Sequence, residues 1–369
     1  MRIAVNASSL KFNRFETFAQ LAKLHTEHSF LFFYDAEINS LNLPENSISI
    51  VIKPQATIPL KWKIWYNLKL PRALKKNNAN IFISENFISL KCKIPQVLLS
   101  PDLTYIFRPE LIDKKQILFY KKNTPKFLSK AEKIVVNSHF FKNEIVERFK
   151  IDEQKIGIIY PEIKKNSAII SQEERESIKE KYAEGNEYFI YKGIISAEQN
   201  LVNLLKAFSF FKKRQRSKMQ LLITGKHGAE YEEFVRSLQS YRFRNDVTIL
   251  EEVTSNETKK ILAGAYAFLY VPFYESEGDE VINAMNLQVP LIVSNTQFLQ
   301  EYGGDAALYV DPSNFNDIAE KMMELFKDEQ KRKDLIQNGK LQIEKFLDKK
   351  RDEILFELFE NEAKKNPLS

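Results

Sequence analysis

Residues 275–280 gather acidic side chains at a spacing that matters for any anion bound nearby. Four of these six positions are carboxylates, at Glu275, Glu277, Asp279 and Glu280. Charges this close create a local negative field that repels a phosphate-like group. Two lysines could offset it, because Lys192 directly precedes Gly193 and Lys226 directly follows Gly225. We expect both lysines at strand ends, where open α/β folds bind their ligands.

Metal and thiol chemistry have little support in the sequence. The chain has one cysteine, Cys92, and four histidines, too few for the usual metal sites. His25 and His28 lie three residues apart without an evident carboxylate companion. Cys92 lies between two lysines that could lower its pKa, but no histidine is paired with it. We therefore predict no metal ion, no catalytic cysteine and a reducing compartment.

Composition excludes several further classes. With 369 residues, of which 44% are hydrophobic, the chain exceeds a single core and is not disordered, so two domains are expected. The net charge of +6 is too small to require nucleic acid. No glycine precedes Gly157, which excludes a glycine-rich phosphate loop from the first half. The longest nearly uncharged stretch, 261–274, is too short to span a membrane, so we expect no transmembrane helix.

Short β-branched or aromatic runs alternate with helical patterns along the chain. This alternation predicts parallel sheets covered by helices, an α/β fold. In the first half we predict strands at 3–5, 30–33, 48–51, 81–83, 97–99, 134–136 and 156–160. Helices are predicted at 15–24, 60–74, 117–128 and 140–149.

A polar, charged segment at 162–185 marks a predicted domain boundary, with a helix start near Ser171. The second half repeats the pattern, with strands at 188–191, 221–223, 247–250, 267–271, 291–293 and 308–310. Its helices are predicted at 199–214, 230–238, 256–262 and 281–286, followed by two or three amphipathic helices in 314–360. We assign residues 1–163 to an amino-terminal acceptor-side domain and 164–345 to a carboxy-terminal donor-side domain. A last helix within 346–369 is expected to cross back to the first domain.

Residues 271–295 resemble the signature segment of retaining GT-B glycosyltransferases, specifically the large family 4. Six positions fall in register with it: Glu275, Gly278, Ala284, Met285, Pro290 and Ile292. Other segments similar to the family are 191–200, 221–225 and 301–312, and more loosely 134–138 and 155–161. The resemblance covers essentially the whole chain, most strongly after residue 188. It implies two Rossmann-like domains facing an interdomain cleft.

The resemblance also implies a reaction. A sugar leaves a nucleotide diphosphate, and the growing negative charge is neutralised without a bound metal or other cofactor, by cations and by backbone N–H groups at a helix start. In the family the residue matching Glu275 lies near the donor sugar, and the one matching Asn283 contacts the ribose. The remaining donor-binding candidates are Lys192, Gly193, Gln199, Lys226, Ser276, Gly278, Val281, Ile282 and Glu301. Asp102, after the strand at 97–99, is a candidate for acceptor handling.

The sequence departs from the family where cations are expected. The positions of the family's arginine and lysine clamp are Ile194 and Gln199. Losing one donor to a developing anion costs about 2.7 to 4 kcal/mol, so two losses would slow transfer by roughly four to six orders of magnitude if nothing substitutes. Lys192 and Lys226 are the nearest substitutes, and Lys11 and Arg14 could contribute from the first domain.

Two functions stay open from the sequence. The first is retaining transfer from a nucleotide sugar to a saccharide or lipid-linked saccharide in polysaccharide biosynthesis, in the cytoplasm, with no nucleic-acid partner. The second is a degenerate glycosyltransferase-like protein that binds a glycan or serves as a partner-subunit scaffold. The segment 61–70 holds both tryptophans among lysines, which is compatible with a peripheral contact at the inner membrane. Family members carry a comparable aromatic helix packed inside the first domain, which favours a structural role instead.

Overall fold

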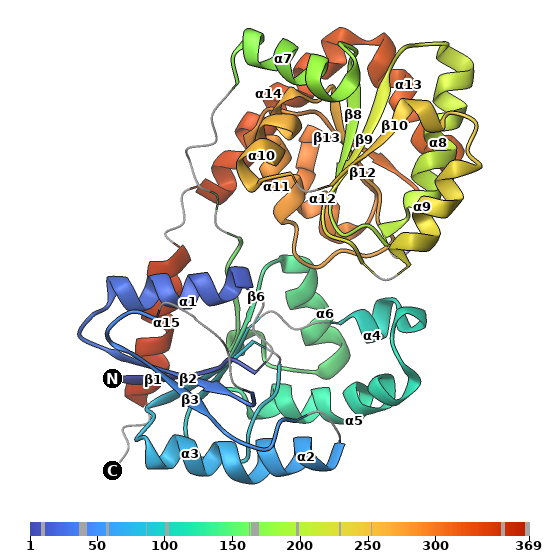
Figure 1. Ribbon diagram of the computed structural model, residues 1–369. Coiled ribbons are helices and arrows are strands. Elements are labelled where there is room, and N and C mark those ends of the chain that lie inside the picture. The colour runs from blue at the N-terminus through green and yellow to red at the C-terminus, as the bar shows by residue number, and fades with distance from the viewer. Residues whose placement is uncertain are drawn as a thin grey trace. The chain divides into compact units, whose positions relative to one another are not determined.

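The computed structural model describes residues 1–8, 12–36, 43–56, 59–85, 87–99, 103–161, 163, 170–196, 199–228, 230–251, 253–347 and 351–365. The chain divides into two compact units (Figure 1). Unit 1 comprises Met1–Tyr160 together with Lys350–Ser369, and unit 2 comprises Pro161–Lys349.

Unit 1 is built on a seven-stranded parallel sheet of the predicted kind. The strands are β1 (Arg2–Asn6), β2 (Ser29–Tyr34), β3 (Ser47–Val51), β4 (Ile81–Ser84), β5 (Gln96–Leu99), β6 (Lys133–Val136) and β7 (Ile156–Ile158). Their order is β3-β2-β1-β4-β5-β6-β7, and every pairing is parallel. Continuous apolar runs such as Phe30 to Phe33 are buried because helices cover both faces of a parallel sheet.

The helices of unit 1 follow the predicted pattern. They are α1 (Phe12–Leu24), α2 (Pro59–Ile64), α3 (Leu70–Lys76), α4 (Thr104–Phe107), α5 (Lys114–Lys130), α6 (His139–Phe149) and α15 (Arg351–Lys365), with a π-helix, η1 (Trp65–Lys69), between α2 and α3 and short 3₁₀ turns η2 (Pro109–Leu111) and η3 (Glu153–Lys155). In Figure 1, α1 and α15 lie on one face of the sheet and α2, α3 and α5 on the other. The single helix predicted over 60–74 is therefore interrupted by a π turn.

Helix α15 belongs to unit 1 although it is the last element of the chain. Its residues Leu355, Phe356 and Phe359 are buried in the same core as Ile3 and Phe32. The apolar stripe of an amphipathic helix must be buried against some partner, and for α15 the partner is the first unit. The amphipathic helices predicted in 314–360 number three: α13 (Phe315–Lys327), α14 (Glu329–Leu347) and α15.

Unit 2 holds the second predicted sheet, with six parallel strands. They are β8 (Tyr188–Lys192), β9 (Gln220–Thr224), β10 (Val247–Leu250), β11 (Ala267–Tyr270), β12 (Leu291–Ser294) and β13 (Ala307–Val310). The strand order β10-β9-β8-β11-β12-β13 is the 3-2-1-4-5-6 order of a Rossmann fold. The chain therefore reverses its direction of winding between β8 and β11.

The remaining helices of unit 2 flank this sheet. They are α7 (Gln172–Ala183), α8 (Leu201–Gln215), α9 (Tyr231–Gln239), α10 (Ser255–Gly264), α11 (Asp279–Asn286) and α12 (Gln297–Gly303), with 3₁₀ turns η5 (Arg244–Asp246) and η6 (Gly304–Ala306). The predicted start near Ser171 is confirmed, because Ser171 and Glu174 form a capping box at the first turn of α7. Figure 1 shows α8, α9 and α13 on one side of the sheet and α7, α10, α11 and α14 on the other.

Candidate active site

The strand order of unit 2 determines where its ligand site lies. In open α/β sheets, ligands bind beyond the carboxyl ends of the strands, at the point where the strand order reverses. That point lies between β8, which ends at Lys192, and β11, which ends at Tyr270. Gly193 follows β8 directly, and Glu275 lies five residues beyond β11. Topology thus brings three sequence-predicted residues, Lys192, Gly193 and Glu275, to one edge of the sheet.

Two glycines allow the turns after β8 and β9 to touch. The Gly193 N–H donates to the Thr224 carbonyl at 3.1 Å. Gly225 has a φ of +144°, and a Cβ there would lie 1.6 Å from the Gly193 carbonyl oxygen. Only glycine tolerates both this dihedral and this approach. The strand ends that carry Lys192 and Lys226 are consequently held together by backbone contact.

Glu275 is partly buried and folded back onto its own loop. Its Oε1 accepts hydrogen bonds from the backbone N–H groups of Ser276 and Glu277, both at 2.7 Å. Its Oε2 accepts from the hydroxyl of Tyr270. Burial nevertheless raises the pKa of the Glu275 carboxyl above its ordinary value. A carboxylate oxygen can accept two hydrogen bonds, so Oε2 keeps one acceptor position for a ligand hydroxyl.

Two tyrosines beneath Glu275 were not singled out from the sequence. Tyr191 of β8 and Tyr270 of β11 stack with ring centroids 6.2 Å apart. The Tyr191 hydroxyl donates to the Ile194 carbonyl at 2.8 Å. Burial raises the pKa of both phenols well above the usual value, so both stay neutral donors. The signal was present in the sequence, because each tyrosine lies at or next to the carboxyl end of its strand.

Lys192 does not stand free at the strand end. Its ammonium group forms an ion pair with the Glu280 carboxylate, and each side chain is 25% exposed. One of the four neighbouring carboxylates is therefore neutralised within the fold, and the Glu275 carboxyl accepts three hydrogen bonds. The negative field expected over 275–280 is weaker than the sequence alone indicates. Glu280 therefore competes with a phosphate for the Lys192 ammonium group.

Lys226 and its neighbours extend the site toward β10. Its side chain is exposed, and its carbonyl accepts from the Ile195 N–H at 2.8 Å. His227 stacks on Tyr231 at 3.6 Å, and the Tyr231 hydroxyl donates to Glu251. Beyond the end of β10, a cavity of about 530 Å³ is lined in part by Glu251 and Thr254. His227, Tyr231 and Glu251 were not singled out from the sequence.

The turn into α11 requires the glycine at its start. Gly278 caps the helix with a φ of +75°, and a Cβ there would lie 2.3 Å from the Tyr302 ring. The side chains of Val281 and Ile282 are 0% and 2% exposed, so a ligand could reach these two residues only through their backbone. Asn283 is exposed on the helix surface.

Gln199, Glu301 and Asn200 occupy different positions around the site. Gln199 and Glu301 are partly buried, and the Tyr191 hydroxyl lies 3.5 Å from Gln199 Oε1. Asn200 is buried, and its amide donates to the carbonyls of Val271 and Pro312 at 2.8 and 2.7 Å. Asn200 therefore connects the start of α8 by hydrogen bonds to the segments that follow β11 and β13.

Several predicted residues fall outside the described part of the chain. These are Asp102, Lys11 and the side chain of Arg14. Asp102 stays a prediction from sequence. Ile194, at the position of the family's arginine, is 52% exposed, so the residue at that position offers apolar surface instead of a cation.

Unit 1 has its own strand-order reversal, between β1 and β4. Asn6 ends β1 opposite Ser84 at the end of β4, and both are buried. The Ser8 hydroxyl contacts Asn6 Oδ1 at 2.9 Å and the Tyr66 hydroxyl at 2.8 Å. This polar cluster was missed from the sequence, where its only signal was an asparagine directly after the apolar run of the first strand.

Two expectations about histidine and cysteine are wrong. His28 has carboxylate neighbours, since its Nε2 lies 3.2 Å from Glu27 and 3.5 Å from Glu360. Burial raises the pKa of the Cys92 thiol rather than lowering it. Among the described residues, no group of three or more His, Cys, Asp or Glu side chains is arranged to hold a metal ion. No helix in the described ranges is long and apolar enough to cross a bilayer.

Comparison with known proteins finds a family match within unit 2. Residues 172–342 match the family model described as glycosyl transferases group 1. Two relatives match a larger part of the chain. The O-antigen chain mannosyltransferase B of Escherichia coli is 25% identical over 288 residues, covering 76% of this chain and 75% of that protein. The O-antigen chain mannosyltransferase RfbU of Salmonella typhimurium is 26% identical over 275 residues, covering 73% and 71%.

Solved structures support the same fold. The HepE protein of Anabaena in complex with UDP-glucose superimposes with a TM-score of 0.74 at 13% identity, covering 98% of this chain and 100% of that one. The chain therefore has the GT-B fold, with two Rossmann-like sheets. Together the matches support glycosyltransferase activity and do not favour the alternative of a non-enzymatic scaffold.

Proposed function

We propose that this protein is a retaining family 4 glycosyltransferase that transfers a mannosyl unit from a nucleotide sugar to a saccharide or lipid-linked saccharide. The observation that carries the proposal is the convergence of Glu275 with the Gly193–Gly225 contact at the strand-order reversal of unit 2. The names of the two O-antigen mannosyltransferases support the sugar and the polysaccharide pathway. The HepE complex with UDP-glucose supports a nucleoside diphosphate as the carrier.

In the proposed reaction each group has a task. The remaining acceptor position of Glu275 would orient a donor-sugar hydroxyl. The first backbone N–H groups of α11, together with Lys192 once it leaves Glu280, would stabilise the departing diphosphate. Val281 and Ile282 would contribute through their backbone, because their side chains are buried. No step in this scheme requires a metal ion.

The acceptor is proposed to reach unit 1. Ser8 is partly exposed beside the buried Asn6 and Tyr66 at the carboxyl end of β1, and its hydroxyl group offers the chemistry that recognises saccharide hydroxyls. Asp102 stays a candidate on the same domain. A cytoplasmic reaction, with lipid-linked acceptors reached at the inner membrane, completes the proposal.

A transfer assay tests the activity directly. Purified protein is incubated with nucleoside diphosphate sugars, including mannose donors, and release of nucleoside diphosphate is measured with and without saccharide acceptors. We expect turnover with a mannose donor, and anomeric configuration determined by NMR should be retained. In parallel, thermal shift is measured with a panel of nucleoside diphosphates. If no nucleotide changes the melting temperature at millimolar concentration, the transferase proposal fails and the scaffold alternative gains support.

A further inference from the structure

One surface of unit 1 has a composition that the proposed reaction does not use. Between Glu45 and Glu85 the sequence has no acidic residue and seven basic ones, at Lys53, Lys61, Lys63, Lys69, Arg72, Lys75 and Lys76. From Lys114 to Lys130 helix α5 carries six lysines and no acid, at Lys114, Lys115, Lys121, Lys122, Lys126 and Lys130. We call the outer sides of α2, η1, α3 and α5 the basic face.

The two halves of the basic face are joined by aromatic packing. The Trp62 and Phe119 rings meet edge to face with centroids 4.9 Å apart, which connects α2 to α5. Figure 1 shows α2, α3 and α5 on the same face of the sheet of unit 1. The cations of the two segments therefore contribute to one region of the surface.

These helices have a buried inner side and an exposed outer side. Trp65 and Tyr66 are 0% and 4% exposed, and Trp65 Nε1 donates to the Ile52 carbonyl at 2.7 Å. In contrast, Leu68 and Leu118 are 48% and 69% exposed. The inner side of segment 61–70 therefore packs in the domain, as the structural interpretation predicts, and its outer side faces solvent.

Within the described part of the chain, most cations of the basic face have no acidic partner. Across the part of the chain that the structure describes, the lysines at 61, 63, 75, 76, 114, 115, 121, 122, 126 and 130 form no ion pair with an acid. Ten such cations without acidic partners create a field that attracts anions.

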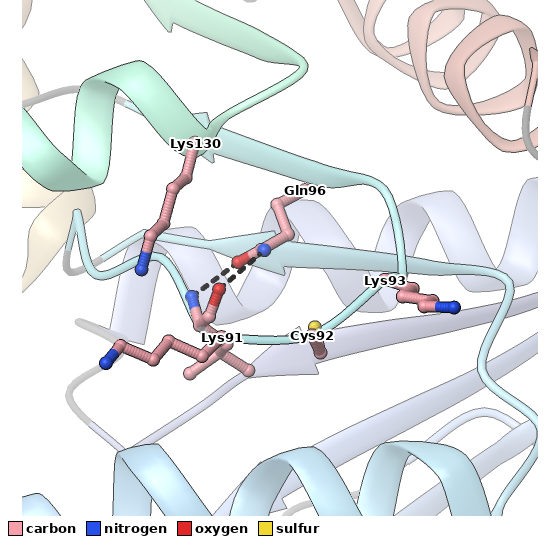
Figure 2. A pocket seen from close by; sticks show the side chains of 6 residues that line it. Lys91, Cys92, Lys93, Gln96 and Lys130 are labelled. Carbon is pink, nitrogen blue, oxygen red and sulfur yellow. Dashed lines mark hydrogen bonds between the residues drawn. The ribbon is translucent and has the colours of Figure 1, made fainter.

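A pocket at the end of α5 continues this charge. It has a volume of about 440 Å³ and is lined by Leu90, Lys91, Cys92, Lys93, Gln96 and Lys130. Figure 2 shows Lys91 and Lys130 extending to the same side of the 90–93 segment, while Lys93 extends away. The Gln96 amide is occupied by the backbone of Leu90, at 2.6 and 3.0 Å. Partial burial, followed by the charges of Lys91 and Lys126, lowers the pKa of Lys130.

From these observations we infer that the basic face docks unit 1 on the surface of an anionic lipid bilayer. Lysines attract the headgroups, and the exposed Leu68 and Leu118 insert at the boundary with the acyl chains. A second copy of this chain is a poor occupant, because a symmetric contact would oppose two faces of the same sign. Nucleic acid would use the cations but would leave the two exposed leucines without a role. The inference concerns binding alone and does not depend on sugar transfer.

Vesicle co-sedimentation tests the inference on the full chain. Phosphatidylcholine vesicles with and without phosphatidylglycerol are the probes. We expect binding only when the anionic lipid is present, with weakening at high salt. Each lysine near an anionic bilayer contributes roughly fivefold in affinity, so a variant with Lys61, Lys63, Lys121 and Lys122 changed to alanine should bind at least about 50-fold more weakly.

A matched control removes the same number of charges elsewhere. Lys213, Lys218, Lys333 and Lys340 are exposed lysines of unit 2, and changing these four to alanine should leave vesicle binding nearly unchanged. An equal loss in both variants would overturn the inference, because net charge alone would explain it. Thermal unfolding of both variants checks that each remains folded.

The leucines separate a bilayer from a nucleic acid. Leu68→Ser together with Leu118→Ser should weaken vesicle binding several-fold and leave the salt dependence intact. Binding of duplex DNA or RNA is measured at the same ionic strength. Tighter binding to nucleic acid than to anionic vesicles, unaffected by the leucine changes, would overturn the inference. Failure here leaves the transfer assay unaffected, and lack of transfer leaves this test standing.

Discussion

At the scale of single residues, the proposed reaction depends most on Glu275. Glu275→Gln keeps the volume and an oxygen that can accept from the N–H groups of Ser276 and Glu277, but it removes the negative charge. We expect kcat for sugar transfer to fall by about 10²- to 10³-fold with the fold intact. Steady-state kinetics give the measurement, and Glu233→Gln, an exposed residue of α9, is the control. Equal kcat for the wild type and Glu275→Gln would remove Glu275 from the site.

The raised pKa of Glu275 also has a consequence for stability. Because burial raises its pKa above the ordinary value of 4.5, the folded state holds this proton more tightly than the unfolded chain does. Stability is then highest below pH 4.5 for this group and is lost as pH rises through the folded pKa. Relative to Glu275→Gln, the wild type should lose free energy of unfolding as pH increases above about 4.5. Urea unfolding at several pH values measures the difference in unfolding free energy between the wild type and Glu275→Gln. A difference that does not change with pH would contradict the prediction.

Substitutions at Lys192 and at Glu280 are expected to have different effects on the affinity for a nucleoside diphosphate. Lys192→Ala should weaken binding of a nucleoside diphosphate by about 1 to 3 kcal/mol, because it removes a cation from the phosphate position. Glu280→Gln releases Lys192 from its ion pair and should leave affinity equal or stronger. Lys226→Ala is expected to weaken binding by a similar 1 to 3 kcal/mol. Calorimetry decides, and unchanged affinity in Lys192→Ala would exclude it as a phosphate contact.

At the scale of secondary-structure elements, the turn into α11 depends on Gly278. Gly278→Ala places a Cβ 2.3 Å from the Tyr302 ring at a φ of +75°, so we expect a loss of at least about 1 kcal/mol in unfolding free energy. Gly339 offers a matched control, since its Cβ would meet neighbours only at 3.8 Å inside helix α14. Gly339→Ala should stabilise by about 0.5 to 1 kcal/mol. Chemical denaturation compares the two, and destabilisation of similar size in both would contradict this account.

At the scale of the whole molecule, the chain returns to its first unit at the end. Phe359 of α15 is 0% exposed in the core of unit 1, so Phe359→Ala should cost about 3 to 5 kcal/mol. Amide hydrogen exchange should show the loss of protection in unit 1, with unit 2 unchanged. Ile354→Ala on the same helix is the control, because Ile354 is 39% exposed and should cost much less. A loss of amide protection confined to unit 2 would contradict the prediction that α15 stabilises unit 1.

The sequence by itself determined the elements and their type. Alternating runs such as Phe30 to Phe33 followed by amphipathic segments predict parallel sheets, because apolar periodicity reports which side of an element is buried. Ser171 with Glu174 marked the start of α7 for the same local reason. The resemblance over 271–295 selected Glu275, whose Oε1 accepts from the adjacent N–H groups of Ser276 and Glu277, and Gly278, which adopts a φ of +75° at the start of α11. The departures at Ile194 and Gln199 were also visible without coordinates.

Tertiary structure alone decided which side chains meet. The pairing of Lys192 with Glu280 joins residues 88 positions apart, and the Tyr270 contact that holds Glu275 depends on the path of the chain after β11. The clusters of Asn6, Ser8 and Tyr66 and of His227, Tyr231 and Glu251 likewise form only when strand ends converge. Local sequence constrains dihedral angles and the buried side of each element. Long-range contacts depend on strand order and packing, and these decide whether a charge is free or already paired.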